Sequence, residues 1–229
     1  MLNFQQTEAF MKKYLEVLQG CPLFQGIQPE DLSAMLACLE PRVVRAARHQ
    51  PILREGEPAV WVGILLSGQA QVVREDYDGN RTILTQLEPG ELFGESFACA
   101  EVPALPVSVT AVAPAEAMLL DCRRVTASCC NACTFHSAVV FNLLKVVAAK
   151  NLRFHEKLEI TSKRTTRERL MTYLLAQAKA HNSRQFVIPF DRQALADYLS
   201  VDRSGLSAEI SKLRAEGILD CCRSSFTLL

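Results

Sequence analysis

Four cysteines gather in one short segment, where their types and spacing are suited to metal or redox chemistry. The segment "DCRRVTASCCNACTFH" carries Cys122, Cys129, Cys130 and Cys133, and His136 closes it. Thiolates three or four residues apart on one helix face can bind zinc or an iron–sulfur cluster, or form a redox disulfide. The alternative is a set of reduced free thiols, the usual state of cysteine in the cytoplasm. Cys122, Cys129 and Cys133 are therefore the redox or metal candidates, with the cofactor undetermined.

The same segment also contains a possible nucleophile and base, Cys133 and His136. A Cys–His enzyme needs an oxyanion-stabilising element and a residue that orients the histidine. The neighbouring sequence shows no sign of either, so we expect no enzymatic activity.

A second chemically distinctive segment lies near the C-terminus and reads "DRQALADYLSVDRSGLSAEISKLR". Its spacing predicts a short helix from Arg192 to Leu199, with Asp191 as the N-cap, and a break at Ser200-Val201. Asp202 can cap a second helix, which buries apolar residues spaced four and three apart, namely Leu206, Ile210 and Leu213.

The free face of this second helix is small, polar and led by an arginine. It carries Arg203, Ser204, Ser207, Ala208 and Ser211. Small side chains let a helix enter a major groove deeply, and an arginine near its start can donate paired hydrogen bonds to a guanine or a phosphate. The pattern indicates a helix-turn-helix that reads DNA. The alternative is an ordinary helical hairpin with a solvated polar face.

The distribution of charge agrees with a polyanionic partner for the C-terminal part. Residues 161–229 carry 11 Lys and Arg against 7 Asp and Glu, whereas residues 1–160 carry 14 against 18. The N-terminus lacks the basic-then-apolar order of a signal peptide. The longest apolar stretch is shorter than the ~18 residues of a membrane span. We expect a cytoplasmic protein that does not bind membranes.

Other segments supply the elements that would position these residues. Short strands separated by turn signals fill residues 42–121, which favours an antiparallel barrel or jelly roll, with a hairpin expected at Ser67-Gly68. Residues 137–160 lack Pro and Gly and predict a long helix whose wide apolar stripe needs the barrel or a second copy as partner. Residues 163–180 predict a further helix, and "ILDCCRSSFTLL" predicts a strand pair.

The order of barrel, long helix and winged helix-turn-helix resembles the CRP/FNR family of bacterial transcription regulators. The resemblance is carried by "CPLFQGIQPEDLSAML", by "GELFGE" at 90–95, by the long helix and by residues 191–219. It implies an α+β fold with an N-terminal antiparallel β jelly-roll of the cyclic-nucleotide-binding type, a long dimerisation helix and a C-terminal winged helix-turn-helix. The corresponding domains are residues 1–136 for effector sensing, 137–160 for dimerisation and 161–229 for DNA binding.

The resemblance also implies partners and DNA-contacting residues. It implies a homodimer on a two-fold symmetric site in double-stranded DNA, with RNA polymerase as a further partner in activation or repression. The implied contacts are Arg203, Ser204, Ser207, Ala208, Ser211, Lys212, Arg192 and Gln193. The founding member has Glu at the position of Ser204 and Arg at that of Ala208, so the target sequence should differ. The alternative is a ligand- or redox-sensing module that acts through protein partners without reading DNA.

The sequence departs from the family members that bind cyclic nucleotides, so we do not expect cAMP or cGMP as the effector. Family members that bind cyclic nucleotides follow a Gly-Glu pair with an Arg-Ser or Arg-Thr pair; here Gly94-Glu95 is present but Leu105-Pro106 stands at the second place. A buried phosphate without its cation costs several kcal/mol, and Pro106 also lacks an N–H donor. We expect another small molecule or a redox or metal signal. The candidate pocket comprises Phe93, Gly94, Glu95, Ser96, Leu105, Pro106 and Val107.

Overall fold

The computed structural model describes residues 4–75, 81–127 and 134–229. The chain divides into two compact units, Met1–Ala149 and Lys150–Leu229. The boundary falls inside one helix, α5 (Thr134–Thr161). The separate dimerisation segment expected at 137–160 stays a prediction.

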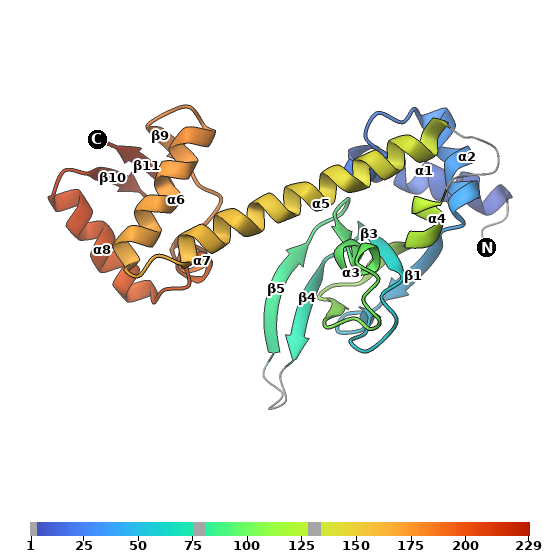
Figure 1. Ribbon diagram of the computed structural model, residues 1–229, viewed down its shortest axis with the longest axis horizontal. Helices are drawn as coiled ribbons and strands as arrows, with labels where there is room; N and C mark the ends of the chain where they lie inside the picture. The colour runs from blue at the N-terminus through green and yellow to red at the C-terminus, as the bar shows by residue number, and fades with distance from the viewer. Residues whose placement is uncertain (1–3, 76–80, 128–133) are drawn as a thin grey trace. The chain divides into compact units, whose positions relative to one another are not determined.

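Two antiparallel sheets lie in the N-terminal unit together with its helices (Figure 1). One sheet has the order β1-β8-β3-β6 and the other β2-β7-β4-β5. The strands are β1 (Arg42–Ala46), β2 (Pro51–Leu53), β3 (Trp61–Ser67), β4 (Ala70–Glu75), β5 (Arg81–Leu87), β6 (Leu92–Phe93), β7 (Ser108–Ala111) and β8 (Ala115–Asp121). The expected antiparallel jelly-roll is confirmed, and the segment containing Pro114 separates β7 from β8.

The hairpin expected at Ser67-Gly68 is wrong. β3 pairs with β6 and β8, whereas β4 pairs with β5 and β7, so the turn carries the chain from one sheet to the other. Gly68 has a φ of +79°, and a Cβ there would lie 2.2 Å from the carbonyl oxygen of Pro114. Glycine is thus required by the turn and by close packing against the β7–β8 connection. A turn signal in a sequence marks a reversal of the chain and not the strand that will be paired.

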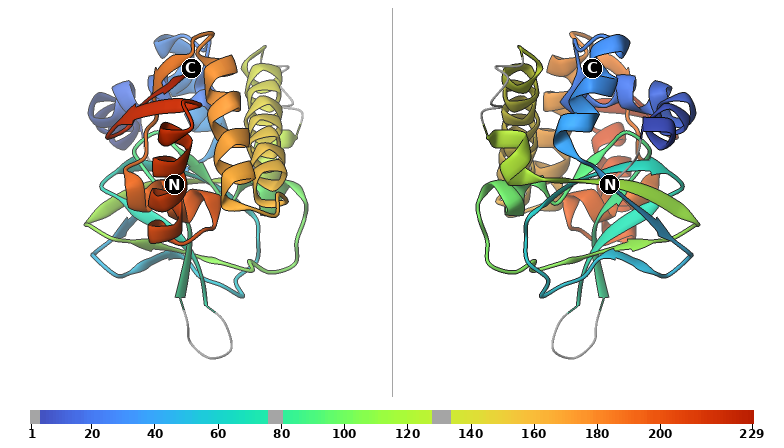
Figure 2. Two further views of the ribbon diagram at one scale, coloured as in Figure 1. Left: turned by 90° about the vertical axis from the view of Figure 1, so that its left-hand side faces the viewer. Right: turned by 90° about the vertical axis from the view of Figure 1, so that its right-hand side faces the viewer.

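Two apolar cores lie on the two faces of the first sheet. Leu65 of β3 and Leu119 of β8 face the second sheet, where they join Val109 and Ala111 of β7. Neighbouring residues of the same strands, such as Ile64 and Met118, face helices instead. These helices are α1 (Phe4–Gly20), the short 3₁₀ helix η1 (Pro22–Phe24) and α2 (Pro29–Leu39), and Figure 2 shows α1 and α2 beside the strands. β3 is therefore buried on both faces and reads as a continuous apolar run.

The first half of α5 packs into the helix-covered core through Val139 and Leu143. Between them in the sequence lies a buried polar residue, Asn142, whose Nδ2 donates to the carbonyls of Leu23 (3.1 Å) and Gln25 (2.8 Å). This side chain joins α5 to the turn after η1. Two short helices complete the unit, α3 (Glu95–Cys99) and α4 (Cys122–Thr126).

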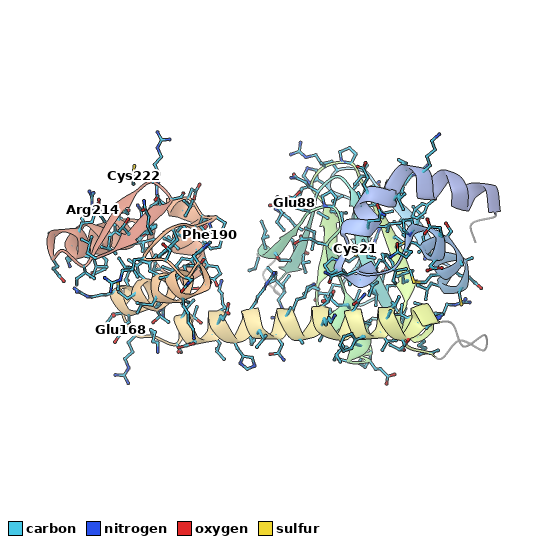
Figure 3. The ribbon with its side chains drawn as sticks, turned by 90° about the horizontal axis from the view of Figure 1, so that it is seen from above. Cys21, Glu88, Glu168, Phe190, Arg214 and Cys222 are labelled. Carbon is cyan, nitrogen blue, oxygen red and sulfur yellow. The ribbon has the colours of Figure 1, made fainter. Side chains whose placement is uncertain are left out.

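The C-terminal unit combines the second half of α5 and three further helices with a small sheet (Figure 1). Its elements are α6 (Thr166–Ala180), β9 (Gln185–Val187), α7 (Arg192–Leu199), α8 (Arg203–Ala215), β10 (Leu219–Cys222) and β11 (Ser225–Leu228). The predicted strand pair is confirmed as β10 and β11, and β9 adds a third strand beside β11. At the end of β10 the side chain of Cys222 is exposed (Figure 3). No helix in the described parts of the chain has both the length and the hydropathy of a membrane span.

Candidate nucleic-acid interface

The predicted pair of short helices is confirmed as α7 and α8, with the expected caps. The Asp191 carboxylate accepts from the backbone N–H of Ala194 at 2.8 Å, and the Asp202 carboxylate accepts from that of Gly205 at 2.9 Å. Between them Ser200 adopts the left-handed conformation, with a φ of 54°. Each aspartate satisfies one N–H that the first helical turn leaves unpaired. The sequence thereby fixes where α7 ends and α8 begins.

Arg169 of α6 holds the turn between the two helices. Its Nη1 donates to the carbonyls of Ser200 (2.7 Å) and Leu199 (3.2 Å), and its Nε donates to that of Lys163 (2.9 Å). A guanidinium at this place satisfies carbonyls that the end of α7 leaves unpaired and offsets the negative end of the helix dipole. Sequence reasoning missed this residue, because the two carbonyls of the turn, those of Leu199 and Ser200, lie 30 and 31 positions away and no local pattern marks them.

The inner face of α8 is fixed by apolar burial and by an ion-pair network. Leu206, Ile210 and Leu213 are buried, as predicted. At the edge of that face, Arg167 of α6 donates to the Glu216 carboxylate at 3.0 Å and lies 3.7 Å from that of Glu209. The hydrogen bond from Arg167 lowers the pKa of Glu216. Glu209 is thus turned towards α6.

The outer face of α8 carries the residues predicted to read DNA. Arg203, Ser204, Ala208, Ser211 and Lys212 are exposed, and Ser207 is partly exposed. The hydroxyls of Ser207 and Ser211 each donate at 3.0 Å to a carbonyl four residues earlier, and that of Ser204 donates to the Asp202 carboxylate. This hydrogen bond is the main cause of the lowered pKa of Asp202. The face therefore presents one guanidinium, one ammonium and small side chains.

The two candidates on α7 differ in their surroundings. Gln193 is exposed, and its Nε2 donates to the Asp197 carboxylate at 2.9 Å. Arg192 is partly buried; its guanidinium lies 5.8 Å from the centre of the Phe226 ring, and its Nη2 lies 4.0 Å from Sγ of Cys221. Arg192 thus packs against the sheet formed by β10 and β11, so Gln193 is the better placed of the two to meet a phosphate.

The candidate effector residues from the end of β6 onward are mostly part of the core. Phe93 is buried between the sheets, and a Cβ on Gly63 would lie 2.1 Å from its ring, so the ring occupies the space that glycine leaves. Glu95 is buried, and its Oε1 accepts from the hydroxyl of Ser96 at 3.0 Å. Gly94 has a φ of +77°, and a Cβ there would meet the Trp61 carbonyl oxygen at 2.8 Å.

The segment where a phosphate-binding arginine would stand is closed by its own hydrogen bonds. Leu105 and Val107 are buried. The backbone N–H of Leu105 donates to the carbonyl of Glu57 at 2.8 Å, and its carbonyl accepts from Gly56 at 2.9 Å. Pro106 has no N–H. Neither Leu105 nor Pro106 therefore has a backbone donor free for an anion.

The cysteine cluster is only partly described. Cys122 is buried, whereas Cys129, Cys130 and Cys133 lie outside the described residues. His136 is buried, and its Nδ1 has no hydrogen-bond partner within the described ranges. Among those ranges no group of three or more His, Cys, Asp or Glu side chains could hold a metal ion. A metal or iron–sulfur site at this cluster stays a prediction.

Comparisons with known proteins bear on both units. Residues 43–129 match the family model "Cyclic nucleotide-binding domain", and residues 168–229 match "Crp-like helix-turn-helix domain". A "CRP-like cAMP-activated global transcriptional regulator" of Mycobacterium tuberculosis is 34% identical over 80 residues, which are 35% of this chain and 35% of that protein. A "Cyclic AMP receptor protein" of Thermus thermophilus is 32% identical over 78 residues, 34% of this chain and 35% of that protein. The chain thus spans about a third of the length of these curated relatives.

Solved structures agree in fold over most of the chain. The catabolite activator protein of Thermus thermophilus superimposes with a TM-score of 0.53 and 23% identity, covering 91% of this chain and 93% of that one. The "c-di-GMP Responsive Global Regulator CLP" of Xanthomonas campestris gives 0.56 and 17%, covering 88% and 99%. At these identities the likeness shows the fold alone.

Proposed function

The chain belongs to the CRP/FNR family of bacterial transcription regulators, and we propose that it is itself a cytoplasmic, sequence-specific DNA-binding regulator that acts as a homodimer. The single observation that carries the proposal is the exposed Arg203 at the first residue of α8, on a helix whose other face is fixed by buried leucines and by Arg167. A helix held in this way can place its first turn in the major groove, where the guanidinium can donate paired hydrogen bonds to a base edge. RNA polymerase is the further partner proposed from family membership.

The homodimer is proposed on the apolar surface of α5. Phe141, Leu144 and Leu152 share one face of the helix, and each is more than half exposed in the single chain. Large exposed apolar side chains on one long helix mark an interaction site, and a second copy of α5 would cover them. A two-fold dimer presents two copies of α8 to two half-sites of DNA, which is what a symmetric site requires.

We propose that the signal is not a cyclic mononucleotide. The named relatives are a cAMP-activated regulator and a cyclic AMP receptor protein, yet Leu105 and Pro106 offer neither a cation nor a free N–H donor to a phosphate. Calorimetric titration of the purified protein with cAMP and with cGMP is expected to give no measurable heat of binding. A micromolar dissociation constant for either nucleotide would overturn this part of the proposal. Another small molecule, or a redox or metal signal, remains as the proposed switch.

The DNA-reading role of α8 is tested with Arg203→Ala. Selection from a random DNA library first identifies a high-affinity site for the unmodified protein. The substitution is expected to weaken binding to that site by about 1–3 kcal/mol, roughly 5- to 150-fold, because paired hydrogen bonds to one base are lost. The slope of log K against log salt should also fall if the guanidinium touches a phosphate. Fluorescence anisotropy at several salt concentrations measures both quantities.

The matched control is Lys179→Ala, which removes one exposed positive charge from the last turn of α6 in the same unit. It should leave the affinity within about twofold, since an isolated surface charge away from the interface contributes little. Equal losses in the two variants would mean that only net charge matters. An unchanged affinity in Arg203→Ala would favour the alternative, a sensing module that acts through protein partners.

A further inference from the structure

Two cysteines far apart in the sequence meet in the N-terminal unit. Cys99 ends α3, Cys122 begins α4, and their sulfur atoms lie 3.8 Å apart. Interactions of the fold position both cysteines. The backbone N–H of Cys122 donates to the carbonyl of Val60 at 2.9 Å, and Ala98, which precedes Cys99, lies in the same apolar core as Cys122. Cys99 lies four residues after Glu95, in the helix that carries the candidate effector residues Glu95 and Ser96.

We propose that Cys99 and Cys122 are an oxidisable thiol pair, which a hydroperoxide converts into an intramolecular disulfide. Sulfur atoms at 3.8 Å are in contact, and closing to a bond of about 2.05 Å requires an approach of only about 1.8 Å. The step balances with the peroxide as oxidant. The Cys99 thiolate attacks one oxygen of hydrogen peroxide and breaks the O–O bond, which gives a sulfenic acid and a hydroxide ion that takes up the proton lost by the thiol and becomes water. The Cys122 thiol then attacks the Cys99 sulfur, forms the S–S bond and releases the sulfenic oxygen as a second water.

The surroundings assign different roles to the two sulfurs. Cys99 is exposed and can meet a dissolved oxidant, whereas Cys122 is buried and meets only Cys99 among the described cysteines. Burial raises the pKa of Cys99, and the hydrogen bond with Cys122 acts in the opposite direction. Burial raises the pKa of Cys122 to about 12. Since thiolates are the reactive form, the oxidation should be slow at neutral pH and should need minutes to hours of exposure.

The sequence offers a direct readout of this bond. Between Arg81 and Arg123 there is no lysine or arginine, so trypsin releases residues 82–123 as one peptide, and Cys99 and Cys122 are its only cysteines. The full-length protein is treated with hydrogen peroxide, denatured, blocked with N-ethylmaleimide without reduction, and digested. The disulfide form of this peptide carries no maleimide and weighs about 2 Da less than the unalkylated dithiol peptide, the mass of two hydrogens. The peptide from reduced protein instead carries a maleimide on each cysteine. We expect the disulfide form to become the majority and to revert with dithiothreitol.

Three variants separate this pair from the other cysteines. Cys99→Ser and Cys122→Ser should abolish the lighter peptide, and Cys222→Ser, which removes an exposed thiol of the other unit, should leave its yield unchanged. The proposal fails if both cysteines of residues 82–123 remain alkylated after oxidation. It fails equally if Cys99 stops at the sulfinic acid or joins a peptide carrying Cys129, Cys130 or Cys133. Stoichiometric zinc held by the pair in the purified protein would overturn it as well, since 3.8 Å also suits two thiolates on one tetrahedral zinc.

A regulatory consequence rests on the proposed function. The disulfide would tie the helix after Gly94-Glu95 to α4, the last described element before α5. We expect peroxide to change the dissociation constant for the selected DNA site about fivefold or more in the unmodified protein and to leave that of Cys99→Ser unchanged. An unchanged constant in protein that carries the disulfide would overturn this consequence. If reduced protein binds no DNA at all, the proposed function fails, while the peptide masses still decide the thiol pair.

Discussion

Asn142 shows how one polar residue positions an apolar helix. It interrupts the longest apolar stretch of the sequence, yet it is buried and satisfies two carbonyls around η1. A leucine there would leave these carbonyls without their donor, so the amide sets which turn of α5 meets which turn of the N-terminal helices. Arg169 acts in the same way on α7, through two carbonyls. Both are side chains that fix backbone at a distance in the sequence.

Asn142→Ala is expected to destabilise the protein by about 1–3 kcal/mol, because two buried carbonyls lose their partner. Urea unfolding followed by circular dichroism measures the change. The matched control is Asn151→Ala, which makes the same replacement at an exposed position of the same helix. It should change the free energy of unfolding by less than about 0.5 kcal/mol. Equal effects would mean that helix propensity, and not the buried amide, decides the outcome.

At the scale of elements, α5 combines two surfaces of different character. Val139 and Leu143 pack into the core of the N-terminal unit and Ile160 into that of the C-terminal unit. Leu144, Leu152 and Phe154 instead remain exposed. A helix apolar all round is normally buried on every side. The uncovered residues are therefore the part of α5 that the single chain leaves without a partner.

Leu152→Glu is expected to shift the protein from dimer to monomer. A charge placed in an apolar helix–helix contact must be desolvated without a partner, which costs several kcal/mol. Light scattering on a sizing column should find about twice 25.4 kDa for the unmodified protein and about 25.4 kDa for the variant. Arg153→Glu places a negative charge at an exposed position nine residues after Leu144, half a turn away from that side chain, and should remain dimeric. A monomeric unmodified protein at micromolar concentration would contradict the proposed dimer.

At the scale of the whole molecule, the C-terminal unit depends on ionised carboxylates. The pKa of Glu168 is lowered by the backbone N–H of Thr165, that of Asp202 by Ser204 and that of Glu216 by Arg167. Glu168 and Thr165 form a capping box at the start of α6, and Asp202 caps α8. The acidic limit of stability should therefore be set by helix caps and by one ion pair.

The sign of the pH dependence follows from these directions. A folded pKa below the unfolded values of 4.5 for Glu and 3.8 for Asp stabilises the folded state above those values, and the stabilisation is lost as pH falls. Urea unfolding between pH 7 and pH 3 should show a free energy that declines below about pH 4.5. Glu216→Gln removes one such group and should make the decline shallower. A free energy that stays constant down to pH 3 would contradict this account.

The parts of the molecule that could be predicted are those with local causes. Asp191 and Asp202 each accept a hydrogen bond from an N–H three residues later and so cap α7 and α8. The spacing of Leu206, Ile210 and Leu213 by four and three residues identifies the buried face of α8. Both helices were therefore predicted from the sequence. The family resemblance supplied the order of the domains. Pairing across the fold was not predictable, because no local pattern encodes it. Gly68 was assigned to a hairpin it does not make, and the contact of Cys99 with Cys122 spans 23 residues.

The small side chains on α8 limit the number of base pairs that this protein can recognise directly. Of the exposed residues on the outer face, only Arg203 carries several donors in a fixed geometry; Ser207 and Ser211 already donate within the helix, and Ala208 has no polar atom. A recognition helix of this kind obtains most of its sequence specificity from one base pair in each half-site and tolerates substitution of the adjacent base pairs. Its choice among genomic sites would then depend heavily on the distance between the two half-sites and on how readily the intervening DNA bends.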